Sequence, residues 1–107
     1  MTNAWSRDNR DYNFYTKVDI NWSNFGENTD GYAPDVVIKF GGNHLMLLNE
    51  NDDGVVEYSF NGRTVHGELD PNLPTKGLTF DMRPVNYIWF RVKSGSIGPI
   101  KVRIDSW

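Results

Sequence analysis

Polar and apolar residues alternate along much of the chain with the two-residue period of a β-strand. The alternation is clearest over residues 14–22, where Phe14, Val18 and Ile20 share one face and charged residues share the other. Turn-forming residues interrupt the chain about every ten residues, which is typical of a single antiparallel β-sandwich, with the eight-stranded jelly roll as one arrangement. The pattern predicts an all-β domain without helices, with about eight strands over residues 14–22, 35–40, 44–48, 55–60, 63–69, 78–82, 85–93 and 100–105.

The strongest local signal is the dipeptide Asn61-Gly62, which suits a two-residue type I′ turn between twisted strands. We therefore expect a β-hairpin over residues 55–69. A two-residue loop fixes the register of the two strands, because Phe60 must then face Arg63. This register places Tyr58 opposite Val65, Val56 opposite Gly67 and Glu57 opposite His66.

A second hairpin is expected from residues 35–40 and 44–48, because Gly41-Gly42-Asn43 separates two short apolar runs. Residues 85–93 carry aromatic side chains on both faces, which indicates a strand in the centre of its sheet. From these strands we predict a core of Val18, Ile20, Val36, Ile38, Leu45, Leu47, Val56, Tyr58, Val65, Leu78, Phe80, Ile88, Phe90, Val102 and Ile104.

Residues 1–13 show neither a helical nor a strand period, and we interpret them as an extended N-terminal arm preceding a domain over residues 14–107. The arm contains Trp5 and Tyr12, large aromatic residues that a disordered tail usually lacks. Docking on a partner and a frayed terminus remain equal alternatives for this segment. Residues 23–34 form a long loop in which Phe25 and Tyr32 are candidate contact residues.

Composition narrows the possible functions. The chain of 107 residues is long enough for one core, and it has no cysteine for disulfides or thiolate metal sites. A net charge of −3 with scattered basic residues argues against nucleic-acid binding. We see no signal peptide and no apolar run of membrane-spanning length, so no membrane partner is expected.

The turn after residue 48 resembles part of a calcium site. Asn49, Asn51, Asp53 and Gly54 match the opening of a calcium-binding loop, but Phe60 stands where that loop needs a bidentate glutamate. The complete helix–loop–helix site is therefore excluded. A polar turn is the favoured interpretation, and an improvised calcium loop is the alternative.

Candidate catalytic groups are sparse. Glu57, His66 and Glu68 are expected on one hairpin face, where a solvated charge pair is favoured over a metal site or an acid–base pair because the chain has only two histidines. No glycine-rich phosphate loop and no strained nucleophile turn is present. We expect a protein that is not an enzyme and that has no cofactor.

Exposed aromatic residues are better candidates for function, since tryptophan and tyrosine anchor protein interfaces and stack on sugar rings. Trp22 is in phase with a predicted core face, whereas Trp107 is out of phase with the last strand. We predict an interface formed by Trp5, Tyr12, Phe25, Tyr32 and Trp107.

Several segments together resemble small all-β virion proteins of tailed bacteriophages: Leu47-Leu48-Asn49-Glu50, residues 56–62, residues 65–69, residues 77–81, Ile88-Trp89-Phe90-Arg91 and Ser94-Gly95. The resemblance covers about residues 36 to 107 and leaves the arm outside it. It implies a non-enzymatic virion protein, either a capsid decoration or cement protein or a tail or neck element, without catalytic residues.

By the same resemblance, the partners would be other copies of the chain and major capsid or tail proteins, in a homo-oligomer located in the virion and assembled in the host cytoplasm. The alternative is a carbohydrate-binding module or a receptor-binding element that uses exposed aromatics, with Tyr32, Trp89 or Trp107 stacked on a sugar ring.

Overall fold

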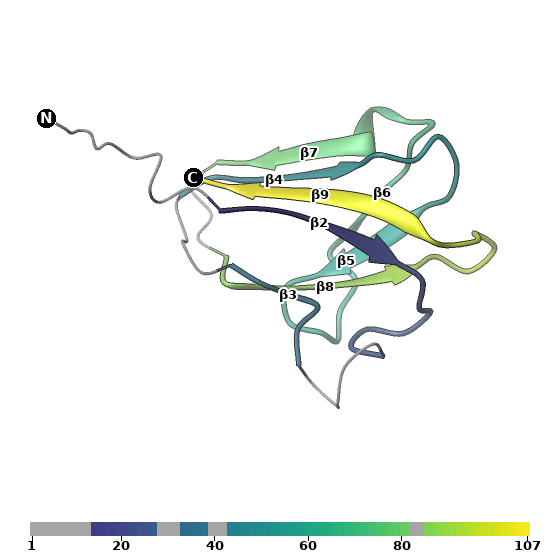
Figure 1. Ribbon diagram of the computed structural model, residues 1–107, viewed down its shortest axis with the longest axis horizontal. Coiled ribbons are helices and arrows are strands. Elements are labelled where there is room, and N and C mark those ends of the chain that lie inside the picture. Colours follow the sequence, from purple (N-terminus) through teal and green to yellow (C-terminus); the bar gives the residue numbers. More distant parts are fainter. Residues whose placement is uncertain (1–13, 28–32, 39–42, 82–84) are drawn as a thin grey trace, which may run out of the picture.

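Two antiparallel sheets of four strands each make up the computed structural model, which describes residues 14–27, 33–38, 43–81 and 85–107 (Figure 1). The strand order is β2-β9-β4-β7 in the first sheet and β3-β8-β5-β6 in the second. In the described part of the chain the strands are β2 (Phe14–Ile20), β3 (Val36–Val37), β4 (Leu45–Asn49), β5 (Val56–Ser59), β6 (Gly67–Leu69), β7 (Gly77–Phe80), β8 (Tyr87–Val92) and β9 (Ile100–Ser106). Within the same residues, the prediction of no helix is wrong only for the short 3-10 helix η2 (Pro74–Lys76), which begins at a proline.

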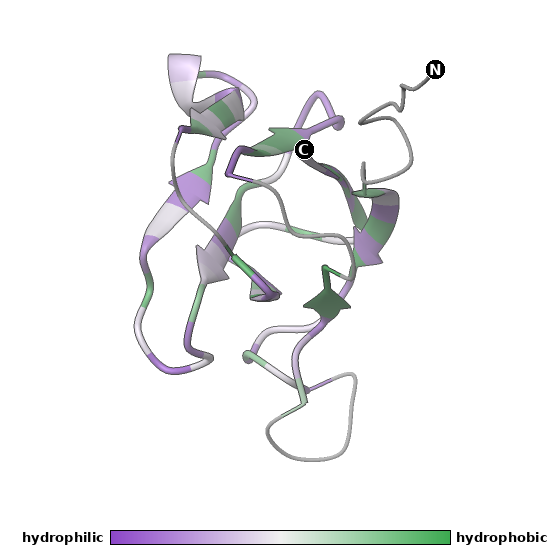
Figure 2. Cartoon of the chain, turned by 90° about the vertical axis from the view of Figure 1, so that its left-hand side faces the viewer, coloured by the Kyte–Doolittle hydropathy of each residue, from purple (hydrophilic) through white to green (hydrophobic). Residues whose placement is uncertain are grey.

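The predicted alternation is confirmed in the long strands. Along β9, buried residues alternate with exposed or partly exposed ones from Ile100 to Ser106, and β4 and β8 follow the same rule. β8 lies between β3 and β5, so its predicted central position is also confirmed. The end-on view in Figure 2 shows the two sheets as two layers, and buried apolar residues of both sheets form one core.

Strands that are far apart in sequence pair in a nested order. β2 pairs with β9, β3 with β8, β4 with β7, and β5 with β6, so the first described strand meets the last and each later pair lies inside the previous one. Two further pairings, β4 with β9 and β5 with β8, join the nested pairs into the two sheets.

The core contains most of the predicted residues. Val65 is the exception, because 39% of its surface is exposed. Val18, Leu78 and Phe80 are only partly buried, although they pack against the core. The buried apolar residues are Ile20, Val36, Ile38, Leu45, Leu47, Val56, Tyr58, Leu69, Val85, Ile88, Phe90, Val92, Ile100, Val102 and Ile104.

The predicted register of the central hairpin is wrong by two residues. Tyr58 lies opposite Gly67, Glu57 opposite Glu68 and Val56 opposite Leu69. The loop is therefore longer than a two-residue turn. A shift of two keeps every side chain on its expected face, which explains why the core prediction survives except near the loop.

Side-chain oxygens explain the longer loop. The hydroxyl of Ser59 accepts hydrogen bonds from the backbone N–H groups of Asn61 and Gly62, at 3.2 and 2.9 Å. The Oδ1 atom of Asn61 accepts from the N–H groups of Arg63 and Thr64, at 2.8 and 2.9 Å. These bonds satisfy the backbone locally and compete with further strand pairing.

The expected second hairpin, from residues 35–40 and 44–48, is also wrong. β3 pairs with β8 in one sheet, and β4 pairs with β7 and β9 in the other. The two segments therefore face each other in different layers, so Val36 and Leu45 contribute to one core from opposite sides. Residues 39–42, which include most of the predicted turn, lie outside the described residues.

Candidate functional site

Two aromatic side chains are exposed where β2 begins and β9 ends. Trp107 is 45% exposed and its ring stacks on that of His44, with 5.4 Å between centroids. The backbone holds this pair in place, because His44 and Trp107 exchange two N–H to carbonyl hydrogen bonds of 3.0 and 3.1 Å. The imidazole Nδ1 of His44 also lies 3.1 Å from a carboxylate oxygen of Asp81. Trp107 is therefore a fixed part of the surface.

Tyr15 is the second of these aromatic residues and is 52% exposed. The guanidinium of Arg103 lies over its ring, 4.7 Å from the centroid, in a cation–π contact. Arg103 is oriented in turn by Asp105, whose Oδ2 accepts from the arginine Nε at 3.1 Å. We call Tyr15, His44, Arg103 and Trp107 the terminal patch.

A hollow of about 280 Å³ lies within this region, lined by Phe14, Tyr15, Arg103, Asp105, Ser106 and Trp107. The second carboxylate oxygen of Asp105 is buried and has no hydrogen-bond partner among the described residues. Apolar rings and a guanidinium thus line one concave surface. Such a combination suits a peptide segment that carries both an aromatic side chain and a hydrogen-bond acceptor.

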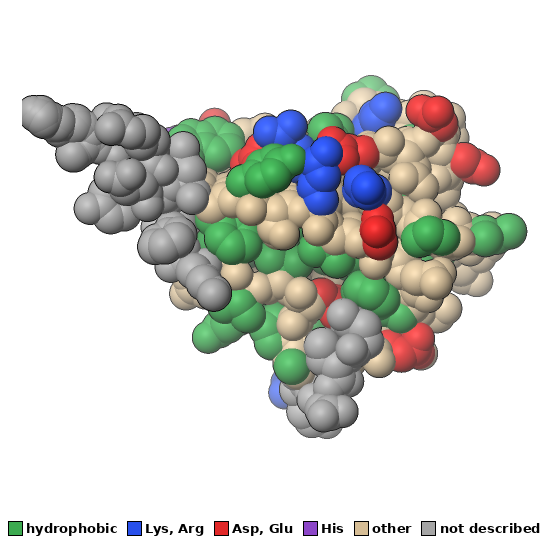
Figure 3. Space-filling view, viewed as in Figure 1, with side chains coloured by type: hydrophobic (Ala, Val, Ile, Leu, Met, Phe, Trp, Pro, Cys, Tyr) green, Lys and Arg blue, Asp and Glu red, His purple; other side chains and the backbone are tan. Residues whose placement is uncertain are grey.

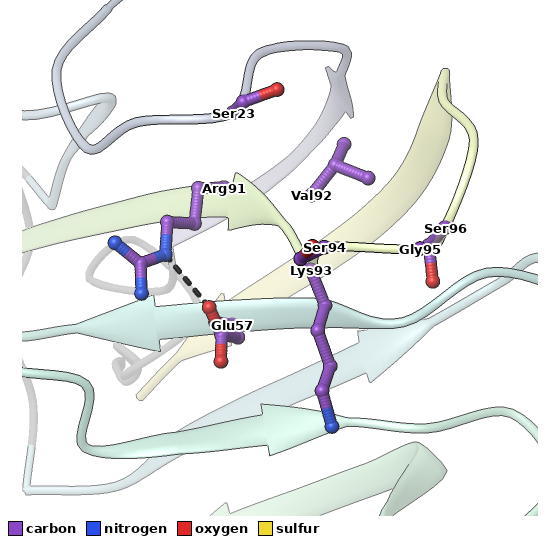
Figure 4. Close-up of a pocket in the computed structure, with 8 residues that line it drawn as sticks. All are labelled: Ser23, Glu57, Arg91, Val92, Lys93, Ser94, Gly95 and Ser96. Carbon is purple, nitrogen blue, oxygen red and sulfur yellow. Dashed lines mark hydrogen bonds and ion pairs between the residues drawn. The ribbon is translucent and has the colours of Figure 1, made fainter.

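The opposite sheet carries a row of paired charges on its outer face. Arg91 on β8 donates from Nε to Glu57 on β5 at 2.7 Å, and Lys93 lies 3.0 Å from Glu68 on β6. The ring of Phe25 packs 4.4 Å from the guanidinium of Arg91. Figure 4 shows the Arg91–Glu57 pair on one side of the neighbouring hollow, while the Lys93 side chain extends along the sheet.

This second hollow measures about 330 Å³ and is lined mainly by polar groups: Ser23, Glu57, Arg91, Val92, Lys93, Ser94, Gly95 and Ser96. Both of its cations are already paired with carboxylates. The nearby carboxylates raise the pKa of Lys93, chiefly through its hydrogen bond to Glu68, so this lysine is a poor general base. The arrangement offers ion pairs and hydroxyls rather than an activated nucleophile.

Trp89 and Tyr87 extend the same face toward the other end of β8. Tyr87 is 49% exposed and its ring centroid lies 6.4 Å from that of Trp89. The loop after β5 covers part of the Trp89 ring, because Gly62 lies directly against it. Only Tyr87 therefore presents a half-exposed ring on this strand.

The contact between Gly62 and Trp89 gives a prediction for stability. Gly62 has a φ of +77°, and a Cβ atom there would lie 2.8 Å from Trp89 Cε2. We expect Gly62→Ala to reduce the free energy of unfolding by about 1–3 kcal/mol, through backbone strain and overpacking. Urea denaturation monitored by tryptophan fluorescence measures this. Gly95→Ala is the matched control: its φ is also positive, at +94°, but nothing lies within 4 Å of the added Cβ.

If Gly95→Ala is as costly as Gly62→Ala, backbone strain alone accounts for the loss, and the contact with Trp89 contributes nothing measurable.

Of the predicted interface residues, only Phe25 and Trp107 lie in the described part of the chain. Trp107 is exposed as expected, whereas Phe25 is partly buried under Arg91. Trp5, Tyr12 and Tyr32 lie outside the described residues. Tyr15 was missed as a candidate although the alternation places it on a polar face, and an aromatic residue in that phase was the available signal.

The turn at residues 49–54 is satisfied by its own side chains. Asn49 is fully buried and donates to the carbonyls of Gly54 and Leu69, both at 3.0 Å, while its Oδ1 accepts from Asn51 N–H at 2.9 Å. Asp53 accepts from the N–H of Gly54 at 2.8 Å. These oxygens therefore serve the turn, as the favoured interpretation of a polar turn requires.

The expected charge cluster on the hairpin is rearranged. Glu57 faces Glu68 and Arg91 and does not face His66, because the register differs by two. The Nδ1 atom of His66 accepts a hydrogen bond from Phe60 N–H at 3.0 Å and so lies within the loop. Within the described ranges, no three histidine, aspartate or glutamate side chains are grouped closely enough to hold a metal ion.

Comparisons of the chain with family models, curated proteins and solved structures found no match. Among the described residues, no helix is long and apolar enough to cross a membrane.

Proposed function

We propose that the protein is a non-enzymatic virion structural protein, a capsid decoration or cement protein that acts through protein–protein contacts as a multimer. The terminal patch carries this proposal. Its two exposed aromatic rings are held by a stacked histidine and an arginine, and they line a concave surface. Rigid aromatic residues beside arginine are the residues that dominate protein interfaces.

The nested strand pairing supports this proposal through the fold. A long antiparallel hairpin that rolls up into two sheets would give this pairing, and on that basis we propose that the sandwich is a jelly roll. Jelly rolls occur in viral capsid domains and also in lectins and cupins, so the topology supports the class of fold and the site supports the function.

In this proposal the partners are other copies of the chain and major capsid or tail proteins. The segment 1–13 joins the domain at Phe14, which lines the same hollow as the terminal patch, and we propose that it acts as an extended arm with Trp5 and Tyr12 bound to neighbouring subunits. Burial of one large aromatic side chain stabilises such a contact by roughly 2 kcal/mol. Several contacts of this size can offset the entropy lost when an arm becomes ordered.

Removal of the arm provides the test. We expect the chain without residues 1–13, and separately the Trp107→Ala variant, to bind purified particles at least about tenfold more weakly, the loss expected for one interface anchor. Co-sedimentation with particles and light scattering measure binding and self-association. Tyr87→Ala is the matched control, because it removes an equally exposed aromatic residue from the other sheet. If the intact chain neither self-associates nor binds particles, the proposal fails.

Tyr87 favours a second candidate function, carbohydrate binding. Its half-exposed ring lies beside Trp89 on the outer face of β8, where a sugar ring could stack. A glycan array probes this candidate, with Trp107→Ala now as the control variant. Saturable binding that Tyr87→Ala abolishes would replace the structural role as the better proposal.

A further inference from the structure

Within the described ranges, one side of β2 forms a long unpaired sheet edge. The strand pairs with β9 along all seven of its residues, and among the described residues no strand pairs with its other side. The other edge strands are shorter: β7 has four residues, β6 three and β3 two. Long regular edges present unpaired N–H and C=O groups, and proteins usually shorten or cover them.

The side of the sandwich that β2 borders is also incompletely closed. Figure 3 views the molecule from this side and shows hydrophobic side chains gathered between the two sheets. Val18 lies on the inner face of β2, yet it is only partly buried. A further strand added beside β2 would cover this residue.

The charges on β2 are self-complementary. On its outer face Lys17 and Asp19 are exposed and flank Val18. We propose that β2 of one copy pairs antiparallel with β2 of a second copy about a two-fold axis at Val18. Lys17 of each copy then lies opposite Asp19 of the other, and the two first sheets join into one continuous sheet. The proposed partner of this edge is therefore a second copy of the same chain.

Neighbouring registers lack this complementarity. In a two-fold pairing, residues that face the core of one copy must lie opposite residues that face the core of the other. The axis must therefore pass through the position of a residue and cannot pass between two residues. An axis at Lys17 places two ammonium groups opposite each other, and an axis at Asp19 does the same with two carboxylates. An axis at Thr16 pairs Lys17 with Tyr15 and forms no ion pair. Like charges directly opposite are unfavourable, so the Val18 register is selected.

Lys17 is already paired within its own chain, 3.1 Å from Glu50. Its side chain extends across β9 to reach this partner, since Glu50 follows β4. In the dimer the ammonium exchanges one carboxylate for another, the second copy's Asp19. The exchange gives Asp19 a partner and leaves Glu50 without the lysine, so the number of ion pairs is unchanged and the choice of register comes from avoiding like charges across the axis.

Charge exchange tests the register in the full-length chain. We expect light scattering to give wild type a mass of about twice the 12.3 kDa of one chain. Lys17→Asp and Asp19→Lys are each expected to shift the measured mass toward that of the monomer. The double variant K17D/D19K restores opposite charges across the axis and is expected to restore the dimer. Asp52→Lys, an equal charge change in an exposed turn, serves as the control and is expected to leave the mass unchanged.

Disulfide trapping tests the same axis by geometry, and the chain has no cysteine of its own. In the proposed register the two Val18 Cα atoms lie about 4.5–5.5 Å apart, within disulfide range. The two Thr16 Cα atoms are offset by four residues, about 13 Å, and cannot be bridged. Oxidation is therefore expected to cross-link Val18→Cys into dimers and to leave Thr16→Cys largely monomeric.

A β2 dimer would explain how the chain forms multimers, and this proposal rests on the proposed multimeric role because it requires a second copy. The two proposals can nevertheless fail separately. A wild-type chain that stays monomeric, a double variant that does not recover the dimer, or cross-linking as efficient at Thr16 as at Val18 would each overturn the β2 pairing. Binding to particles through the arm and Trp107 would be unaffected by those results. If binding to particles does not depend on the arm while the β2 dimer still forms, only the proposed function is refuted.

Discussion

Replacing Asn49 by alanine is expected to reduce the free energy of unfolding by about 3–5 kcal/mol, a large fraction of the stability of a small domain. The side chain is fully buried and satisfies three backbone groups: the carbonyls of Gly54 and Leu69 and the N–H of Asn51. Each group left without a partner in the interior costs about 1–3 kcal/mol. Urea denaturation at neutral pH measures the loss.

The variant Asn49→Asp tests the contribution of the amide N–H donors of Asn49 separately from that of its Oδ1 acceptor. The carboxylate keeps the oxygen that accepts from Asn51, but it places a second oxygen next to the two carbonyls that are 3.0 Å from the amide nitrogen. We expect destabilisation as large as that of alanine at neutral pH, with partial recovery at low pH, where a protonated carboxyl can donate. Asn72→Ala, at an exposed turn, is the control and is expected to change stability by less than about 0.5 kcal/mol.

A loss below about 1 kcal/mol for Asn49→Ala would show that water replaces the amide, and the turn would then not depend on this side chain.

The second large effect concerns the carboxyl group of Asp35, and we expect it to make the protein less stable as the pH rises from about 4 to 6. Burial raises the pKa of Asp35 from 3.8 to about 6, although the backbone N–H of Phe90, which donates at 2.7 Å, opposes the shift. The other oxygen of Asp35 is buried and has no partner among the described residues. Trp22 also faces this carboxyl, but its indole N–H donates to the carbonyl of Phe90 at 2.6 Å.

The sign follows from proton binding. Between the unfolded and folded pKa values the folded chain holds a proton that the unfolded chain has lost, so stability falls with pH across this interval and is constant above it. A shift of two pKa units corresponds to about 3 kcal/mol, which partial solvent access reduces to about 1–2 kcal/mol.

Asp35→Asn removes the titration and keeps an acceptor for Phe90. We expect this variant to be more stable than wild type at pH 7.5 and to lose the slope between pH 4 and 6, as measured by thermal unfolding across that range. Asp52→Asn is the control, at an exposed turn. If wild type and Asp35→Asn show the same slope, the carboxyl of Asp35 is ionised in the fold at pH 5 and the predicted cause is wrong.

The faces of the strands could be predicted from the sequence, and their partners could not. Alternation alone places Val102 and Ile104 inside and Lys17 outside, because a side chain's face depends only on its own strand. Which strand pairs with which depends on distant contacts. Turn residues between residues 38 and 44 indicate a hairpin equally well whether the chain returns beside itself or crosses to the other sheet.

The same limit applies to the candidate sites. Trp107 could be found because it breaks the phase of its strand, and Tyr15 could have been found for the same reason. Asn49 could not be recognised as a buried hydrogen-bonding residue, since asparagine is ordinary in an exposed turn. Its partner Leu69 is twenty residues away along the chain. The terminal patch likewise depends on His44 and Trp107 meeting through the fold.

The nested pairing of the strands also has a consequence for the time course of folding. Phe14 lies opposite Ser106, and β9 is the shared partner of β2 and β4, so the first sheet cannot form until β9 itself has left the ribosome. The hairpin of β5 and β6 can close early, because its contacts are local. Sheets dominated by non-local contacts fold in roughly milliseconds to seconds. During that interval β2 is not yet paired with β9. Nascent chains at high local concentration can then pair with one another through β2.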